Sequence, residues 1–145
     1  MTSAETLSVL VVDESEAFLA GARHWIASRG DLRLVGTARS GASALDAASE
    51  LRPDLVIVDA VLPGIDGFRL TRALKGNADA PLVVVVTFHA SAAARDEALA
   101  AGADGFLAKG DFSDGLDAIL EAWRADRVTT PARPARPESR TARDP

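Results

Sequence analysis

The sequence predicts a doubly wound α/β fold, in which a five-stranded parallel sheet in the order 2-1-3-4-5 lies between two layers of helices, five in all. The first observation is a set of short, continuous apolar runs, of which 55–58 and 81–86 are the clearest. Such runs are too short for helices and typical of strands covered on both faces. The second observation is that a segment with helical spacing follows each run, as expected for parallel strands joined by right-handed crossovers.

The first half of the chain contains the first three strands and two helices. The run 7–12 predicts a strand, and the acidic loop 13–16 leads into a helix with apolar residues at helical spacing: Phe18, Leu19, Ala22, Trp25 and Ile26. Residues 32–38 alternate only partly, which favours an edge strand. An alanine-rich helix then runs from Ser40 to Pro53, and the central strand 55–58 follows.

The second half repeats this alternation. A helix after the central strand carries Phe68, Leu70 and Leu74 and ends at Gly76. The run 81–86 predicts a central strand, and residues 91–101 predict a helix with few large apolar residues, so we expect light packing there. A short strand, 106–108, precedes a final helix whose apolar stripe is Leu116, Ile119, Leu120 and Trp123.

Length and composition indicate one domain, which we expect at residues 1–125. The 145 residues include 48% hydrophobic residues and no cysteine, which fits one core in a reducing cytoplasm. No signal peptide or membrane-spanning run is evident. Residues 126–145 alternate proline with alanine, arginine and serine, and we expect a disordered tail. Residues 1–123 hold 10 basic and 18 acidic residues, which argues against nucleic-acid binding.

Polar side chains follow four of the predicted strands. They are Asp13 with Glu14, Asp59, Thr87 and Lys109. Taken singly, each has a plain explanation as a turn, a helix cap or a solvated loop end. In the strand order 2-1-3-4-5, however, the first and third strands are neighbours, so the three acids converge at the topological switch point where ligands bind in open α/β sheets.

Three crowded carboxylates repel one another unless cations intervene. Lys109 is one available cation, and the acidic cluster is a hard-oxygen site that suits Mg²⁺. A carboxylate beside Mg²⁺, an ammonium and a threonine hydroxyl is well placed to attack a phosphoryl group. The cluster therefore predicts formation of an aspartyl phosphate.

With these motifs, residues 7–123 resemble the receiver domains of two-component response regulators, of the stand-alone type. The matching stretches are 11–14 (Val-Val-Asp-Glu), 53–59 (Pro-Asp-Leu-Val-Ile-Val-Asp), 62–67 (Leu-Pro-Gly-Ile-Asp-Gly), Thr87 and 102–109 (Gly-Ala-Asp-Gly-Phe-Leu-Ala-Lys). The resemblance implies the flavodoxin-like (CheY-like) fold, and a signalling module that catalyses only its own phosphorylation and dephosphorylation.

The resemblance also implies a role for each residue. Asp59 would be the phosphoacceptor, and Mg²⁺ would be held by Asp13, Glu14, Asp59 and the backbone carbonyl of Val61. Thr87 would bind a phosphoryl oxygen and Lys109 would pair with the phosphate. Thr87 and Phe106 would form the switch.

The implied partners are a histidine kinase or phosphotransfer protein, and a downstream protein that binds the face made by the fourth helix, the fifth strand and the fifth helix. The resemblance leaves room for a phosphorylation-dependent homodimer. It implies no contact of this chain with nucleic acid or membrane.

Departures from the family pattern leave a second interpretation of the function open. Glu14 stands where Asp is commoner, Phe88 is bulkier than the residue usually next to the threonine, and Gly110 replaces the usual proline after the lysine. Phe88 and Glu14 favour a phosphorylation-independent pseudo-receiver that acts as a docking module. Two enzyme classes fit poorly. A haloacid-dehalogenase-type phosphatase needs a second Asp where Val61 stands, and a dinucleotide-binding domain needs a glycine-rich turn where acids follow the first strand.

Overall fold

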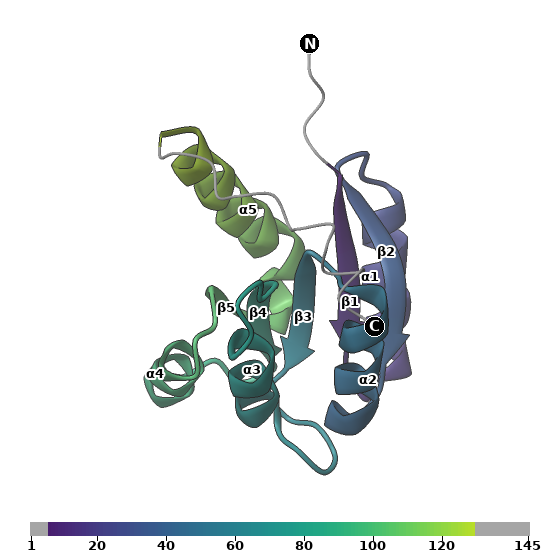
Figure 1. The fold of residues 1–145 in the computed structure, drawn as a ribbon, viewed down its shortest axis with the longest axis vertical. Coiled ribbons are helices and arrows are strands. Elements are labelled where there is room, and N and C mark those ends of the chain that lie inside the picture. Colours follow the sequence, from purple (N-terminus) through teal and green to yellow (C-terminus); the bar gives the residue numbers. More distant parts are fainter. Residues whose placement is uncertain (1–5, 130–145) are drawn as a thin grey trace.

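The computed structural model of the protein describes residues 6–129, with side chains described to residue 126. It confirms the predicted fold, because five parallel strands form one sheet in the order β2-β1-β3-β4-β5 (Figure 1). In chain order the elements are β1 (Leu7–Val12), α1 (Glu16–Ala27), β2 (Leu32–Ala38), α2 (Gly41–Leu51), β3 (Leu55–Asp59), α3 (Gly67–Lys75), β4 (Leu82–Thr87), α4 (Ala92–Ala100), β5 (Gly105–Ala108), the 3₁₀ turn η1 (Lys109–Asp111) and α5 (Phe112–Thr129).

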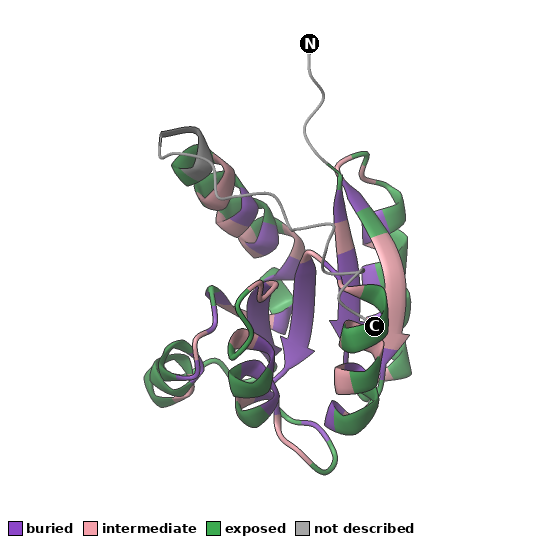
Figure 2. Ribbon diagram, in the orientation of Figure 1, coloured by how far each residue is buried: buried purple, intermediate pink, exposed green. Residues whose placement is uncertain are grey.

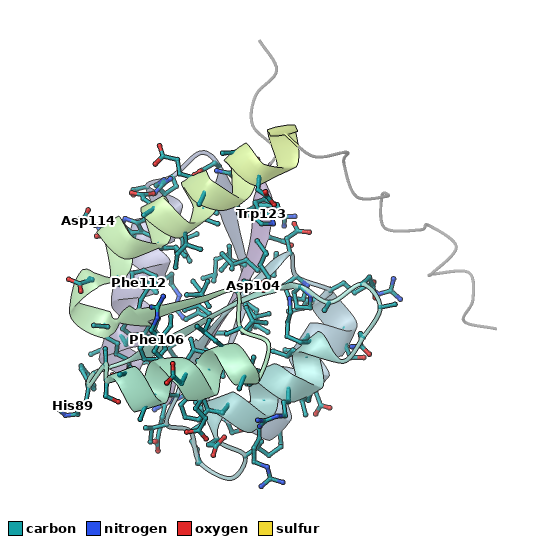
Figure 3. All side chains as sticks on the ribbon, turned by 90° about the vertical axis from the view of Figure 1, so that its left-hand side faces the viewer. His89, Asp104, Phe106, Phe112, Asp114 and Trp123 are labelled. Atoms are coloured by element: carbon teal, nitrogen blue, oxygen red, sulfur yellow. The ribbon has the colours of Figure 1, made fainter. Side chains whose placement is uncertain are left out.

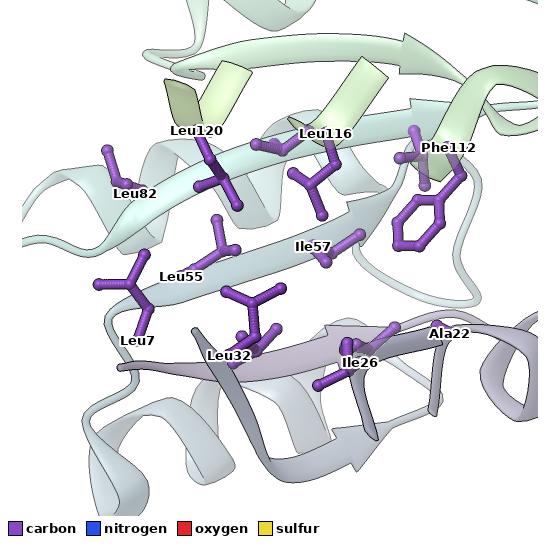
Figure 4. Close-up of a cluster of buried hydrophobic side chains, with 14 of the residues drawn as sticks. Leu7, Ala22, Ile26, Leu32, Leu55, Ile57, Leu82, Phe112, Leu116 and Leu120 are labelled. Atoms are coloured by element: carbon purple, nitrogen blue, oxygen red, sulfur yellow. The ribbon is translucent and has the colours of Figure 1, made fainter. Parts of the chain in front are cut away.

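Helices cover both faces of the sheet, and the strands β3 and β4 are buried along their whole length (Figure 2). One apolar cluster joins α1 and α5 to one face and includes Ile57 of β3, Leu116 and Phe112 (Figure 4). The other cluster joins α2, α3 and α4 to the opposite face and includes Val58 and Leu70. Because successive strand residues point to opposite faces, a strand that is apolar throughout serves both clusters.

Two glycines shape the loop that follows β3. Gly64 has φ +78°, a left-handed conformation that side chains with a Cβ rarely adopt. Gly67 begins α3 so close to the end of β3 that an added Cβ would lie 2.2 Å from the Asp59 carbonyl oxygen. The start of α3 therefore packs directly against the backbone of Asp59, which helps to hold this residue in place.

The last helix extends beyond the expected domain boundary. We expected the tail to begin at residue 126, but α5 continues to Thr129. The physical reason is that residues 125–130 contain neither glycine nor proline, and the first residue that opposes a helix is Pro131. The rest of the expected tail, residues 130–145, lies outside the described residues.

Candidate functional site

Four polar residues meet at the carboxyl edge of the sheet, and the parallel topology brings them there. Asp13 follows β1, Asp59 ends β3, Thr87 ends β4, and Lys109 follows β5 as the first residue of η1. All four are buried, although each is charged or polar. Buried charged groups persist where they are paired, so this edge of the sheet is the first place to look for a site.

Lys109 joins the two carboxylates. Its ammonium nitrogen Nζ lies 2.7 Å from Oδ2 of Asp13 and donates a hydrogen bond of 3.3 Å to Oδ2 of Asp59. The two acids reach it from neighbouring strands, since β1 and β3 are paired in parallel up to Val12 and Val58. One cation is thus shared between two buried anions, which leaves the pair of acids with a net negative charge.

Backbone N–H groups hold the second oxygen of each carboxylate. The N–H of Ser15 donates to Oδ1 of Asp13 at 2.8 Å, and the N–H of Val61 donates to Oδ1 of Asp59 at 3.1 Å. In both cases the donor comes two residues after the acid, an arrangement typical of an Asx turn. These bonds fix the orientation of both carboxylates before any ligand arrives.

The environment of Asp59 makes its carboxylate costly to ionise. Burial raises the pKa of Asp59 above its ordinary value, and the charge of Asp13 raises it further. The Val61 N–H and the Lys109 ammonium lower this pKa, but they offset only part of the increase. A negative charge on Asp59 therefore costs free energy in this environment, and a further cation close to the carboxylate would reduce that cost.

A hollow of about 410 Å³ opens above these residues; it is lined by Asp13, Glu14, Ser15, Asp59, Val61, Thr87, Phe88, His89 and Lys109. Val61 and Phe88 on its rim are 70% and 71% exposed. A second hollow, of about 440 Å³, lies at the opposite edge of the sheet between α2 and α3, and no strand-end carboxylate lines it. We place the candidate site in the first hollow because it contains the paired charges.

The residues fit a hard divalent cation. Oδ2 of Asp13 is buried and accepts no hydrogen bond of good geometry, although the Lys109 ammonium lies near it. Among the described residues no three acidic or histidine side chains form a ready-made cluster, because Glu14 is exposed on the rim. Mg²⁺ needs no such cluster, since it usually keeps several waters and binds through one or two carboxylates. Asp13 and Asp59 meet that requirement.

Two residues at the site were missing from the sequence-based prediction. Arg39, directly after β2, donates from Nε and Nη2 to the carbonyl oxygen of Glu14 at 3.2 and 2.7 Å, and so fixes the acidic loop. The strand-end pattern that selected Asp13 would also have found Arg39, because β2 lies next to β1. Phe18, in the first part of α1, has its ring 4.6 Å from the Lys109 ammonium, and no spacing in the sequence indicated this contact.

The two expected switch residues lie toward the same face of the sheet. Phe106 pairs with Val85 in the β4–β5 ladder and packs on the same cluster as Val85. Thr87 is two residues beyond Val85 and so points the same way. Phe106 is half-buried and lies between α4 and α5, whereas His89 lies at the exposed margin (Figure 3).

The fold and the site together define a class of protein: an open, doubly wound α/β domain with an acidic crevice at its switch point. The family model described as "Response regulator receiver domain" matches residues 9–121. The chain belongs to this family.

Relatives and solved structures agree with the family. The chain is 33% identical over 126 residues to the response regulator GacA of Pseudomonas aeruginosa. The aligned residues cover 86% of this chain and 59% of that protein. It is 44% identical over 87 residues to the protein-glutamate methylesterase/protein-glutamine glutaminase 5 of Myxococcus xanthus, over 60% of this chain and 25% of that protein. The chain thus spans about three-fifths or less of these two relatives.

The fold is similar to a receiver domain of known structure. The signal receiver domain of the response regulator NarL from Mycobacterium tuberculosis matches with a TM-score of 0.75 and 28% identity, over 87% of this chain and 99% of that one. Among residues 6–129, no helix is both long and apolar enough to span a membrane.

Proposed function

We propose that this domain accepts a phosphoryl group on Asp59 from a histidine kinase or phosphotransfer protein, in a Mg²⁺-dependent reaction, and signals through protein–protein contacts. The observation that carries the proposal is the setting of the Asp59 carboxylate. It is oriented by a backbone N–H, shares an ammonium with a second acid, and lies in a hollow that opens to solvent. An anion with this geometry is a preorganised nucleophile.

In the proposed reaction an oxygen of Asp59 attacks the phosphorus atom of the donor. One P–O bond forms as the P–N bond of the phosphohistidine breaks, and the electron pair of that bond stays on the imidazole nitrogen. The Lys109 ammonium offsets charge on the transferred group, and the Thr87 hydroxyl, which lines the same hollow, donates to a phosphoryl oxygen. Hydrolysis of the acyl phosphate would return the domain to its starting state.

Asp13 and Asp59 would hold Mg²⁺, with the carbonyl of Val61 and the rim residue Glu14 as further oxygen donors. The ion would supply positive charge next to the transferring oxygens. Asp13 supports this assignment, because its carboxylate is fully buried and its Oδ2, although ion-paired with Lys109 at 2.7 Å, accepts no hydrogen bond of good geometry.

The test is to incubate the protein with acetyl phosphate and Mg²⁺ and to measure its intact mass. We expect one added phosphate, which disappears in Asp59→Asn. Asp66→Asn is the matched control, because Asp66 lies in the same loop and caps α3 through a side-chain oxygen that Asn keeps. Phosphate retained in Asp59→Asn would refute the assignment of Asp59.

A phosphorylation-independent docking module is the second candidate. It is favoured by Phe88, whose ring lies 4.4 Å from the Lys109 ammonium on the rim of the hollow, where it narrows the approach to Asp59. No added phosphate from acetyl phosphate or from a kinase in the wild-type protein, together with unchanged partner binding in Asp59→Asn, would support this alternative.

A further inference from the structure

The Lys109 ammonium is close to two aromatic rings as well as to two carboxylates. Its nitrogen is 4.6 Å from the centroid of the Phe18 ring and 4.4 Å from that of Phe88. Both distances are within the range in which the negative face of an aromatic ring attracts a cation. The Lys109 side chain is only 4% exposed, so these contacts act with little competition from water.

The two rings are held in different ways. Phe18 is half-buried and meets Phe112 edge to face at 5.3 Å, and Phe112 meets Trp25 in the same manner at 5.2 Å. Because Phe112 belongs to the apolar core (Figure 4), these ring contacts anchor Phe18 to the interior. Aromatic pairs of this geometry are favourable beyond the area that they bury.

Phe88, in contrast, is 71% exposed. It follows Thr87 at the end of β4 and belongs to neither apolar cluster. Core packing therefore does not explain a large ring at this position. The contact that the structure does provide for its ring is with the Lys109 ammonium.

We propose that Phe18 and Phe88 form an aromatic clamp, in which Phe88 is a positioning residue for Lys109. A lysine side chain has many rotamers and loses entropy when it is held in one place. Two ring faces restrict the ammonium to the position between Asp13 and Asp59, so that less entropy remains to be lost when it pairs with a phosphoryl group. The clamp itself is a property of the unphosphorylated protein, and its consequence for phosphoryl binding rests on the function proposed above.

The first test observes the clamp without any phosphodonor. Lys75 and Lys109 are the two lysines of the chain, so lysine-selective isotope labelling yields two sets of side-chain signals. Ring currents from two faces should shift the ε-methylene protons of Lys109 upfield of those of Lys75, whose ammonium pairs with Asp104 and the Pro81 carbonyl. Phe88→Leu, which keeps an apolar side chain but removes the ring, should move the Lys109 signals downfield and leave those of Lys75 unchanged.

The second test measures the consequence at equilibrium, where the rate of ligand entry has no influence. The probe is beryllofluoride with Mg²⁺, a phosphoryl mimic. We expect Phe88→Leu to weaken its affinity by about two- to fivefold, and Phe88→Tyr, which keeps the ring face, to restore it. Leu51→Ala is the control, because Leu51 is an exposed apolar residue that does not line the hollow and has no role in the proposed site.

Each outcome decides one point. Lys109 signals that do not move in Phe88→Leu would refute the clamp. Lys109 signals that move while the beryllofluoride affinity stays constant, or falls equally in Leu51→Ala, would refute the positioning role. If the wild-type protein binds no beryllofluoride and accepts no phosphate, the proposed function fails, while the lysine signals still decide whether the clamp exists.

Discussion

The ammonium of Lys109 lies 2.7 Å from Asp13, closer than its 3.3 Å contact with Asp59. The shorter of the two ion pairs of Lys109 is therefore with Asp13, which in our proposal is not the phosphoacceptor. Burial, and after it the charge of Asp13, raise the pKa of Asp59, and the Lys109 ammonium at 3.3 Å offsets only part of this increase. This unequal sharing suggests how the site responds to metal and to substitution.

The first prediction concerns Asp13. Asp13→Asn keeps an oxygen to accept the Ser15 N–H but removes the negative charge that would hold Mg²⁺. We expect Mg²⁺ affinity and the rate of phosphorylation by acetyl phosphate both to fall by about tenfold or more, on the scale of one charged interaction. Metal titration and intact-mass kinetics measure the two effects. Asp46→Asn, an exposed acid on α2, is the control, and equal behaviour of the two variants would contradict the metal assignment.

The second prediction concerns the free energy of unfolding in the presence of metal. An ion that binds only the folded protein stabilises it by mass action, by about 2.7 kcal/mol at a concentration 100 times its dissociation constant. We expect Mg²⁺ to raise the melting temperature of the wild-type protein and EDTA to reverse the increase. Asp59→Asn should reduce the effect, because one of the two buried carboxylates is lost. A melting temperature that is the same with and without Mg²⁺ would show that the hollow binds no such ion.

The third prediction is a pH dependence that arises far from the hollow. Burial alone would raise the pKa of Asp31, but the guanidinium groups of Arg124 and Arg29 outweigh this effect, and the net shift is downward. Arg124 donates to Oδ2 of Asp31 at 2.9 Å, and this bond ties α5 to the start of β2. A lowered pKa in the folded state means that the stabilisation is complete above the unfolded-state pKa and is lost as the pH falls through the folded value.

Asp31→Asn should therefore reduce the free energy of unfolding near neutral pH by about 1 kcal/mol. The difference between variant and wild type should shrink below about pH 4, where the aspartate of the unfolded chain is protonated. Urea denaturation at a series of pH values measures this difference. If the loss in free energy of unfolding is the same at every pH, the packing of residue 31, and not its charge, causes that loss.

The fourth prediction follows the proposed output route. A phosphoryl group on Asp59 would draw in the Thr87 hydroxyl and leave space for the Phe106 ring, which packs on the same face. With beryllofluoride and Mg²⁺, amide exchange should change most within residues 87–112, and Phe106→Ala should weaken the distant changes while Asp59 still accepts phosphate. Phe68→Ala, on α3 in the same apolar cluster, is the matched control. Changes confined to the loops after β1 and β3 would argue against this route.

The fifth prediction concerns the segment beyond α5. Residues 130–145 contain four prolines and no large apolar residue, so we expect them to add little to the folded core. Truncation after residue 129 should leave the melting temperature within about two degrees of the full chain. A larger decrease would indicate that the arginines of this segment bind the acidic domain.

Local sequence patterns were sufficient to predict the strands, the helices and the position of Asp59 at the end of a strand. Runs such as 55–58 are too short for a helix and too uniformly apolar for a half-exposed strand, and both limits follow from local geometry. The same logic placed Thr87 and Lys109 at strand ends. The domain boundary was predicted at residue 125, but α5 continues to Thr129, because a change in composition marks the end of a helix only approximately.

Which of these residues are in contact depends on how the elements pack in the folded domain. Periodicity encodes local conformation and burial, but it does not encode which partner a long side chain reaches across the edge of a sheet. Only the packing of α1 against the start of α5, where Phe18 meets Phe112, brings the Phe18 ring to the Lys109 ammonium. Only the pairing of β2 with β1 brings Arg39 to the Glu14 carbonyl. The unequal sharing of Lys109 between two acids depends on differences of a few tenths of an ångström, which are set by the assembled fold.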